Sequence, residues 1–352
     1  MMRSRPLALL VVLAIGCGAP DPAPPAVHQL RGEALGTTWL VKWLEPALSD
    51  EASIEAATTE ALAEVDRAMS TWRDDSDLSR IRAATGPVVV AEETALVVEA
   101  ALALARDTGG AFDPTVQPLM ELWGFHGTER QTLPTDEEIE AALAQVGFGR
   151  VQIGRDDRGQ PTVDGGGTAL DLSAIAKGHA VDRVSLAISD LGVPDHMVEV
   201  GGEVRAHGRG PSGPLWKVGV DLPQEGWAPG ALLADVVVVT NAAVATSGNY
   251  RQTHRIGDTP IHHTMDPRTG RPAIGLVASA TVIAADCRTA DGFATALMVL
   301  DPDAGLRLVE GRPDLEALLL VPEGETFARR VSTGMARHLV TETAYATPAS
   351  SD

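Results

Sequence analysis

The chain contains 352 residues, with 48 acidic and 28 basic side chains and a formal net charge of −20. This charge repels nucleic acid and anionic lipid headgroups, so we expect no nucleic-acid partner. The length is sufficient for one large domain or two interlocked domains with a full hydrophobic core.

The first 17 residues have the pattern of a secretory signal. Basic residues open the chain, an apolar run extends from Leu7 to Ile15, and Gly16 and Cys17 follow. The run is too short to span a membrane as a mature helix. A cysteine at the cleavage point is typical of bacterial lipoproteins, so Cys17 is predicted to become the lipid-bearing first residue, although Ala14 stands where leucine is usual. The alternative is an ordinary cleaved signal with an incidental cysteine.

The remaining chain divides into three predicted parts. Residues 18–27 form a proline-rich tether, residues 28–342 the folded body, and residues 343–352 a flexible tail. Cys287 is the one cysteine of the body, so lipidation of Cys17 would leave no pair for an intramolecular disulfide. The body would then rely on core packing alone.

Helical periodicity and helix-ending residues predict four helices in the first part of the body. They cover residues 50–69, Glu92–Asp107 before Gly109 and Gly110, a segment that begins at Thr135, and Ser173–Leu191 before Gly192. Thr135 and Glu138 have the spacing of a capping box.

Strand patterns dominate the second half. They cover Val198–Ala206, Trp216–Leu222, Asp235–Thr240, Val277–Ala284 and Leu318–Val321, with a further helix from about Thr289 to Leu300. Because long helices come early and strands late, the predicted fold class is α+β rather than regularly alternating α/β. No clear linker interrupts the body, so we expect one compact unit.

The first polar segment of interest contains Asp113, in a turn with Pro114 after the second helix. A carboxylate in apolar surroundings needs hydrogen-bond donors, such as an amine or a ring N–H of a ligand. Trp123 and Phe125 follow this turn. They could wall a pocket, but core positions are the favoured interpretation.

Glycines 165–167 precede the helix that begins at Ser173, and Lys177 lies near the start of that helix. Glycines before a helix N-terminus let backbone groups approach an anion, and Lys177 adds a positive charge, so a phosphate could bind here. The glycine spacing fits neither a Walker A motif nor a dinucleotide fingerprint. An exposed lysine on a helix that follows a loop is the alternative.

Two polar segments interrupt the strand patterns. Gly201-Gly202-Glu203 indicates a bulge or the close approach of another backbone or a ligand, and Thr246–Arg251 is a similar break. Both could be plain turns, but they lie at strand ends, where ligand loops usually occur.

The stretch from His262 to Thr295 carries the clearest chemical signals. His263 is the best candidate for a group that titrates near neutral pH, and in an extended segment His262 would point the other way. No third His, Cys or Glu lies at a spacing that favours zinc. Asp291 and Thr295 share one helix face, and their oxygen atoms suit Mg²⁺, which completes its shell with phosphate oxygens. Asp291 could instead stabilise the helix dipole.

Eight segments in this order resemble the ApbE family, the FAD:protein FMN transferases. They are Leu35–Trp39, Met69–Trp72 with Ser76–Ile81, Phe112–Phe125, Asp171–Asp182, Gly201–Glu203, Ser247–Arg251, His263–Gly270 and Ala290–Leu300. The resemblance implies an ApbE-like fold in which mixed or antiparallel sheets pack against helices.

The same resemblance implies the reaction. With the FAD pyrophosphate on Mg²⁺, a Ser or Thr hydroxyl of a partner protein attacks the phosphorus bonded to the FMN half, which yields FMN-protein and AMP. Relatives act on membrane subunits of sodium-pumping NADH:quinone reductases and Rnf-type complexes, or on other exported redox proteins. The signal pattern that ends at Cys17 leads us to expect an exported protein anchored by lipid to the inner or the outer membrane.

Site roles also follow from the resemblance. Asp291 and Thr295 would bind the metal through their side chains, and Ala174 through its carbonyl. His263 would be the base that accepts the hydroxyl proton. The residues at FAD-contact positions are Leu35, Asp77, Leu78, Ser79, Asp113, Lys177 and Met265.

The chain departs from the family pattern at four positions. Ala294 stands where several relatives carry a second acidic ligand, so we expect one metal ion with fewer charged ligands. Leu35 replaces Met, Glu203 replaces Asp, and His179 replaces Tyr. Two other functions share these residues: an FAD pyrophosphatase, in which water replaces the hydroxyl, and a non-catalytic FAD-binding lipoprotein.

Overall fold

The computed structural model describes residues 25–127, 130–224, 226–249, 253–257, 259–273 and 275–340. The predicted signal with Cys17, most of the tether, the tail, and Tyr250 and Arg251 lie outside the described residues. Within the described ranges, none of the helices combines the length and the apolar character that crossing a bilayer requires.

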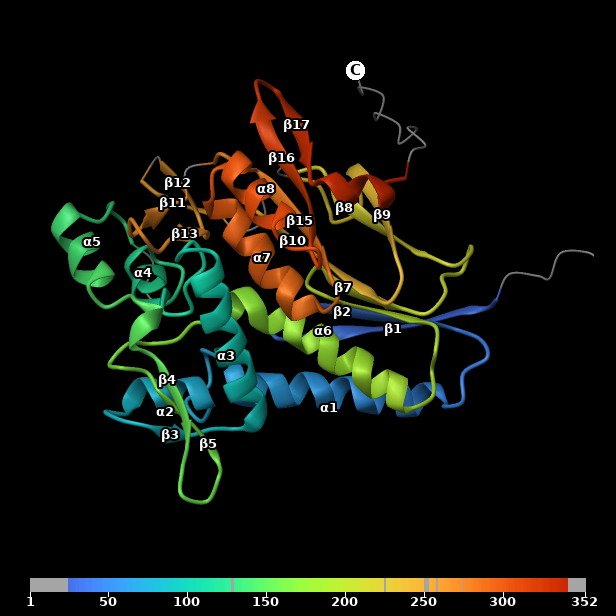
Figure 1. Cartoon of the computed structure of the whole chain (residues 1–352), viewed down its shortest axis with the longest axis horizontal. Coiled ribbons are helices and arrows are strands. Elements are labelled where there is room, and N and C mark those ends of the chain that lie inside the picture. Colours follow the sequence, from blue (N-terminus) through green and yellow to red (C-terminus); the bar gives the residue numbers. More distant parts are fainter. Residues whose placement is uncertain are drawn as a thin grey trace, which may run out of the picture.

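An eight-stranded sheet forms the centre of the molecule (Figure 1), in the order β1-β2-β6-β7-β10-β15-β16-β17. Every neighbouring pair in it is antiparallel. The strands are β1 (Val27–Ala34), β2 (Thr37–Leu44), β6 (His196–Val200), β7 (Glu203–His207), β10 (Ala242–Gly248), β15 (Ser279–Ala284), β16 (Glu316–Glu323) and β17 (Thr326–Val331).

Four long helices bury their apolar stripes together with one face of this sheet. They are α1 (Glu51–Met69), α3 (Glu92–Asp107), α6 (Ser173–Asp190) and α7 (Cys287–Val299). Their side chains join those of the strands in the largest hydrophobic cluster, in which Val41, Val98, Val181, Val282 and Leu297 are fully buried. Burial of this apolar surface is the main force that holds the helices on the sheet.

The other face of the sheet packs against a smaller layer. The hairpin of β8 (Trp216–Asp221) and β9 (Leu233–Val239) and the 3₁₀ turn η2 (Thr333–Arg337) supply Trp216, Val237 and Met335 to a second cluster, which also contains Val244 and Leu318. Both faces of the central strands are therefore covered.

A third apolar cluster joins α4 (Gln117–Leu122) and α5 (Asp136–Leu143) to a region of short strands, at the left of Figure 1. The strands are β11 (Thr253–Ile256), β12 (Thr259–His262), β13 (Met265–Asp266) and β14 (Arg271–Pro272). Trp123 is buried in this cluster, and its Nε1 donates to the Gly270 carbonyl at 2.8 Å. The core interpretation of Trp123 is thus confirmed.

The remaining elements connect these layers. They are α2 (Asp77–Ala83), β3 (Val88–Val89), η1 (Phe148–Arg150), β4 (Gln152–Arg155), β5 (Pro161–Asp164) and α8 (Pro302–Glu310).

The predicted α+β class and the five predicted helices are confirmed. The bounds of α3 are as predicted, and α5 begins with the Thr135–Glu138 capping box. Two expectations about strands were wrong. The strand expected over Val198–Ala206 is two strands joined by a turn at Gly201 and Gly202, and strands also open the body, as β1 and β2.

Candidate active site at one end of the sheet

Two hairpin turns and the end of β10 lie at the same end of the sheet. The β1–β2 turn is Leu35-Gly36 and the β6–β7 turn is Gly201-Gly202, and the Gly201 N–H donates to the Thr38 carbonyl at 3.0 Å. Leu35 has a φ of 53°, which is costly for a residue with a Cβ and persists only where the surrounding structure imposes it. The predicted FAD contact at Leu35 therefore lies beside the Gly201 turn.

Helices α6 and α7 cross closely at Gly178. A Cβ atom on this residue would lie 2.3 Å from the Cys287 carbonyl oxygen and 2.8 Å from the Cβ of Asp291. Only glycine permits this approach, which brings Lys177 and Asp291 together across the crossing.

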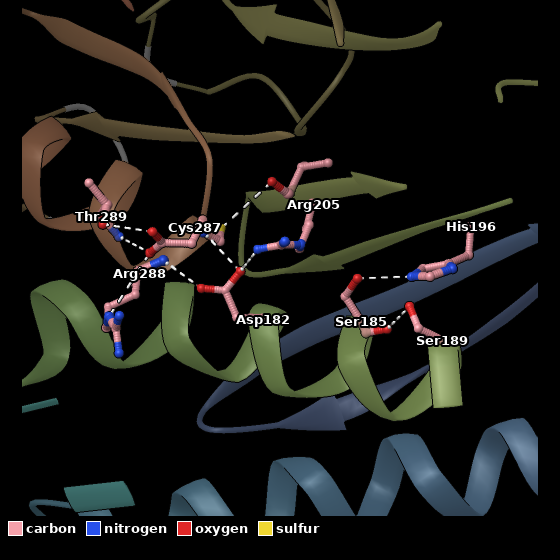
Figure 2. Close-up of polar contacts among 10 residues, drawn as sticks. Asp182, Ser185, Ser189, His196, Arg205, Cys287, Arg288 and Thr289 are labelled. Atoms are coloured by element: carbon pink, nitrogen blue, oxygen red, sulfur yellow. Dashed lines mark hydrogen bonds and ion pairs between the residues drawn. The ribbon is translucent and has the colours of Figure 1, made fainter. Parts of the chain in front are cut away.

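The start of α7 is fixed to α6 by Asp182, as Figure 2 shows. Its carboxylate accepts the N–H groups of Cys287 at 2.9 Å and Arg288 at 3.0 Å, and pairs with Arg205 at 2.5 Å. These N–H groups belong to the first turn of a helix and have no partner within it. The Cys287 thiol beside them is fully buried, and burial raises its pKa well above the usual value.

Figure 2 also shows His196 of β6, whose ring contacts Ser185 further along α6. His196 is fully buried, with Nε2 2.8 Å from the Ser185 hydroxyl and Nδ1 2.9 Å from the Val193 carbonyl. Burial lowers the pKa of His196 to about 4, so the ring is neutral at physiological pH. Its contacts are those of a structural residue.

Of the three predicted metal ligands, Asp291 lies at the α6–α7 crossing, Ala174 one turn before Gly178 on α6, and Thr295 one turn after Asp291 on α7. Asp291 is 1% exposed, and its Oδ2 accepts the Gly178 N–H at 2.9 Å. In a regular helix that N–H would donate to the Ala174 carbonyl, one turn earlier. Because a carbonyl oxygen has two lone pairs, at least one at Ala174 is available to a metal ion. Thr295 follows Asp291 by one turn of α7, and its hydroxyl is 3.2 Å from that of Ser247 at the end of β10.

This donor set fits Mg²⁺. A carboxylate, a hydroxyl and a carbonyl are the oxygen ligands that the ion prefers, and it keeps the rest of its shell for water or phosphate. In the described part of the chain, no group of three or more His, Cys, Asp or Glu side chains is arranged to hold a metal. Ala294, fully buried beside Asp291, adds no ligand atom from its side chain. An ion held here would have a single carboxylate ligand.

Lys177 and Glu203 complete a charge cluster with Asp291, in which the two carboxyl groups are buried and the lysine side chain is 33% exposed. The ammonium Nζ lies 3.1 Å from Oε1 of Glu203 and 3.7 Å from Oδ1 of Asp291. Burial alone would favour a neutral lysine, but the two carboxylates outweigh it and raise the pKa of Lys177. Burial raises the pKa of Glu203, and the Lys177 ammonium at 3.1 Å opposes that shift. The second oxygen of Glu203, Oε2, is buried without a hydrogen-bond partner among the described residues.

Asp113 receives its donors from the protein. Its Oδ1 accepts the N–H of Thr115 at 2.8 Å and the Thr115 hydroxyl at 2.6 Å, and its Oδ2 accepts the Phe148 N–H at 3.1 Å. The expectation that the buried carboxylate needs donors is met within the chain, and its contact with FAD stays a prediction.

The segment Asp77–Ser79 begins α2 and ties it to α3. Asp77 Oδ2 accepts the Ala91 N–H at 2.8 Å and the Thr94 hydroxyl at 2.6 Å, and the Ser79 hydroxyl donates to the Arg73 carbonyl at 2.6 Å. Leu78 is buried in the main core. The polar side chains are thus held by the protein, and their contact with FAD stays a prediction.

His262 ends β12 and His263 follows it in a bend, so the segment is not extended throughout as the sequence-based expectation assumed. His262 Nδ1 lies 3.0 Å from the carbonyl of Asn249, which directly follows β10. The His263 ring meets the edge of Phe125, with centroids 6.5 Å apart. Met265 is buried in the third cluster. Since Asn249 lies two residues after Ser247, the histidine pair is linked to the Thr295 side of the metal ligands.

Three further residues, with no role in the sequence-based prediction, form a chain of contacts that ends just before α6. Trp72 is 77% exposed and stacks on His126 at a centroid distance of 5.8 Å. His126 Nε2 lies 3.4 Å from the buried Asp171, which precedes α6. The Asp171 carboxylate raises the pKa of His126. Trp72 and Asp171 belong to segments that carry the family resemblance, but residue type alone does not show that a tryptophan is exposed.

A groove of about 690 Å³ lies elsewhere on the surface, along α3, α6 and the β4–β5 hairpin. His179, one of the departures from the family pattern, lines it and pairs with Glu93 at 2.8 Å. None of the predicted FAD or metal residues lines this groove, so the candidate site does not extend into it.

Known proteins match this chain over nearly its full length. The model of the ApbE family matches residues 35–319. The FAD:protein FMN transferase of Vibrio cholerae serotype O1 is 35% identical, over 93% of this chain and 96% of that protein. The enzyme of the same name from Klebsiella pneumoniae is 34% identical, over 94% and 95%.

Solved structures agree. The flavin transferase ApbE from Vibrio cholerae superposes with a TM-score of 0.79 at 34% identity, over 90% of this chain and 100% of that chain. The apo form of the flavinyl transferase ApbE from Pseudomonas stutzeri gives 0.78 at 32% identity, over 90% and 98%.

Proposed function

Since this chain belongs to the ApbE family and is an FAD:protein FMN transferase, we propose that it transfers FMN to a Ser or Thr hydroxyl of an exported acceptor with the help of Mg²⁺. The observation that carries the proposal is the buried Asp291 at the α6–α7 crossing. Its carboxylate accepts the Gly178 N–H from α6 and has the Lys177 ammonium at 3.7 Å, and Ala174 and Thr295 lie one helical turn from Gly178 and Asp291.

The proposed roles follow from these groups. Asp291, Thr295 and the Ala174 carbonyl would hold Mg²⁺, which when bound neutralises negative charge on the pyrophosphate. Lys177 binds the same pyrophosphate through its charged ammonium, which points toward Asp291 from the adjacent helix. Leu35, at the sheet end beside Gly201, and Met265, in the third cluster, contribute apolar surface to FAD.

The transfer itself needs a proton acceptor. The acceptor hydroxyl oxygen forms a bond to the phosphorus of the FMN half, and the bond from that phosphorus to the bridging oxygen breaks. AMP leaves with the bridging oxygen. His263 accepts the hydroxyl proton, a task that suits a side chain whose ordinary pKa lies near neutrality. The edge contact with Phe125 holds its ring in place.

A ring of the flavin nucleotide is proposed to stack on Trp72. An exposed indole held flat against His126 offers a ready aromatic surface, and base-like rings stack on such surfaces without a sequence-specific contact.

We propose that the enzyme works outside the cytoplasm, anchored to a membrane through lipid on Cys17 and the proline-rich segment that follows it. The support is the signal-like pattern of residues 1–17. Its acceptors would then be membrane or exported redox proteins, and the catalytic body would be residues 28–342.

An incubation of the purified protein with FAD, Mg²⁺ and an acceptor that has a flavinylation-type Ser/Thr segment tests this proposal. Covalent yellow fluorescence on the acceptor is expected, and it should disappear with EDTA and with an acceptor whose hydroxyl residue is changed to Ala. Label that persists in EDTA would contradict the Mg²⁺ requirement. Free FMN and AMP without label would indicate hydrolysis, and unchanged FAD a carrier.

A further inference from the structure

The charge cluster beside the proposed metal site is not balanced. Asp291 and Glu203 are 1% and 4% exposed and carry two carboxylates, while Lys177 supplies one ammonium. A buried charge without a partner is strongly destabilising. Two buried carboxyl groups therefore face a single ammonium group.

The ammonium is shared unequally. Lys177 Nζ is within hydrogen-bond distance of Glu203, at 3.1 Å, but 3.7 Å from Asp291. Asp291 Oδ2 takes its hydrogen bond from the Gly178 N–H instead. The lysine is thus bonded to Glu203 and only adjacent to the proposed metal ligand.

The β6–β7 hairpin places Glu203 for this contact. The Gly201-Gly202 turn, with φ angles of 61° and 103°, brings the backbone onto the lysine stem, since a Cβ at Gly201 would lie 3.4 Å from Lys177 Cδ. Glu203 is the next residue and begins β7. The turn thus packs against the stem of the lysine while Glu203 binds its ammonium.

We propose that Glu203 is a positioning residue for Lys177. Its carboxylate holds the ammonium beside Asp291 rather than on it, which leaves the Asp291 carboxylate open to a divalent cation. The inference rests on the proposed Mg²⁺ site at Asp291. Without the Glu203 charge, the nearest carboxylate to the ammonium is Asp291, and an ion pair between them would compete with the metal ion.

Metal binding by the FAD-free protein tests the inference without reference to activity. Titration calorimetry with Mg²⁺, or electron paramagnetic resonance with Mn²⁺, gives the dissociation constant. For Glu203→Gln we expect an affinity about tenfold or more weaker, as for other residues that orient metal ligands. Glu203→Asp keeps the charge and should bind metal nearly as the wild type does.

A double-mutant cycle separates positioning from a simple loss of negative charge. In a Lys177→Met background, Glu203→Gln should have no further effect on metal affinity, because no ammonium remains to compete. An equal loss in both backgrounds would overturn the inference. Glu316→Gln is the matched control. The Glu316 carboxylate forms an ion pair with Arg337 at 2.6 Å. In the sheet, Glu316 lies opposite Ile283, at the other end of β15 from Ser279, so metal affinity should not change.

The lysine can also be observed directly, because the chain has three lysines, Lys42, Lys177 and Lys217. In protein labelled with ¹³C at lysine Cε, the signal lost in Lys177→Met identifies Lys177. We expect Glu203→Gln to shift that signal and leave the other two in place, and this also shows that the variant is folded. An unshifted Lys177 signal would contradict the inference. Absence of metal binding by the wild type, or equal binding by Asp291→Ala, would instead contradict the proposed Mg²⁺ site.

Discussion

Gly178 donates its backbone N–H to Oδ2 of Asp291 at 2.9 Å, across the crossing of α6 and α7. The contact joins residues that are 113 positions apart in the chain. It orients the proposed metal ligand and at the same time uses the N–H that would otherwise bond only to Ala174. One hydrogen bond therefore both joins the two helices and orients the proposed metal ligand.

Gly178→Ala should damage stability and activity together. The new methyl would lie 2.3 Å from the Cys287 carbonyl oxygen, so the helices must separate. We expect the free energy of unfolding, measured with urea, to fall by about 2 kcal/mol. Gly311→Ala is the control, since a Cβ there makes only ordinary contacts, at 3.5 Å or more. Equal stability of the two variants would show that the crossing tolerates a side chain.

Asp291→Ala should abolish turnover by removing the one carboxylate proposed to bind metal. Loss of several kcal/mol of charge stabilisation corresponds to at least about a 100-fold fall in kcat. Steady-state transfer of FMN at saturating FAD measures it, and Asp286→Ala, at the N-cap of the same helix, controls for damage to α7. A variant that retains turnover would rule out Asp291 as a metal ligand.

His263→Ala should slow transfer far more than it weakens FAD binding. Loss of a general base costs about 100-fold or more in kcat. Rapid-quench rates and FAD fluorescence titration provide the two measurements. His262→Ala is the natural comparison, because its ring bonds to the Asn249 carbonyl at 3.0 Å. If rate and affinity fell equally in His263→Ala, this residue would be a ligand contact rather than the base.

Trp72→Ala should weaken FAD binding without destabilising the fold. Stacking on an exposed indole corresponds to about a tenfold change in the FAD dissociation constant. Because Trp72 is 77% exposed, stability should change by no more than about 0.5 kcal/mol. Trp227, 48% exposed on the β8–β9 connection, is the matched tryptophan, and its replacement should leave FAD affinity alone. Unchanged affinity in Trp72→Ala would remove this residue from the site.

Acid should destabilise the fold through His196. Its pKa is lowered to about 4 by burial, from an ordinary value of 6.5 that the unfolded chain retains. Between these values the unfolded chain binds more protons, so the stabilising contribution is complete above pH 6.5 and is lost as pH falls towards 4. The loss is about 3 kcal/mol for a shift of this size.

Urea unfolding at pH 7.5 and pH 5 measures this effect. The decrease in stability should be smaller in His196→Gln than in the wild type. His28→Gln removes a partly exposed histidine and serves as the control, with the wild-type decrease expected. The same decrease in His196→Gln would mean that other groups cause the acid sensitivity.

Most helices could be predicted because their signals are local. The capping box at Thr135 and the glycines after Asp107 define helix ends within a few residues. The β2 strand also carries a local strand pattern, with Trp39, Val41 and Trp43 alternating into the core. β1 carries a weaker strand pattern, because most of its residues are small or polar.

The site could be predicted only in part. Asp291 and Thr295 share a helix face by spacing alone, but the atom proposed to bind metal at Ala174 is its backbone carbonyl oxygen, and residue type carries no sign of that. The contact of Lys177 with Glu203 depends on how a hairpin turn meets a helix. Asp113 and Asp77 were expected to face FAD, yet the hydrogen bonds they accept come from protein donors, which are set by tertiary packing.

The burial of Cys287 protects its thiol from oxidation. The thiol is fully buried at the start of α7, and a raised pKa keeps it protonated and unreactive. An oxidant or a labelling reagent reaches it only after the N-terminus of α7 has separated from α6 and Asp182. The rate of thiol labelling therefore reports local opening of the helix that carries Asp291 and Thr295. The measurement needs no flavin, metal or acceptor.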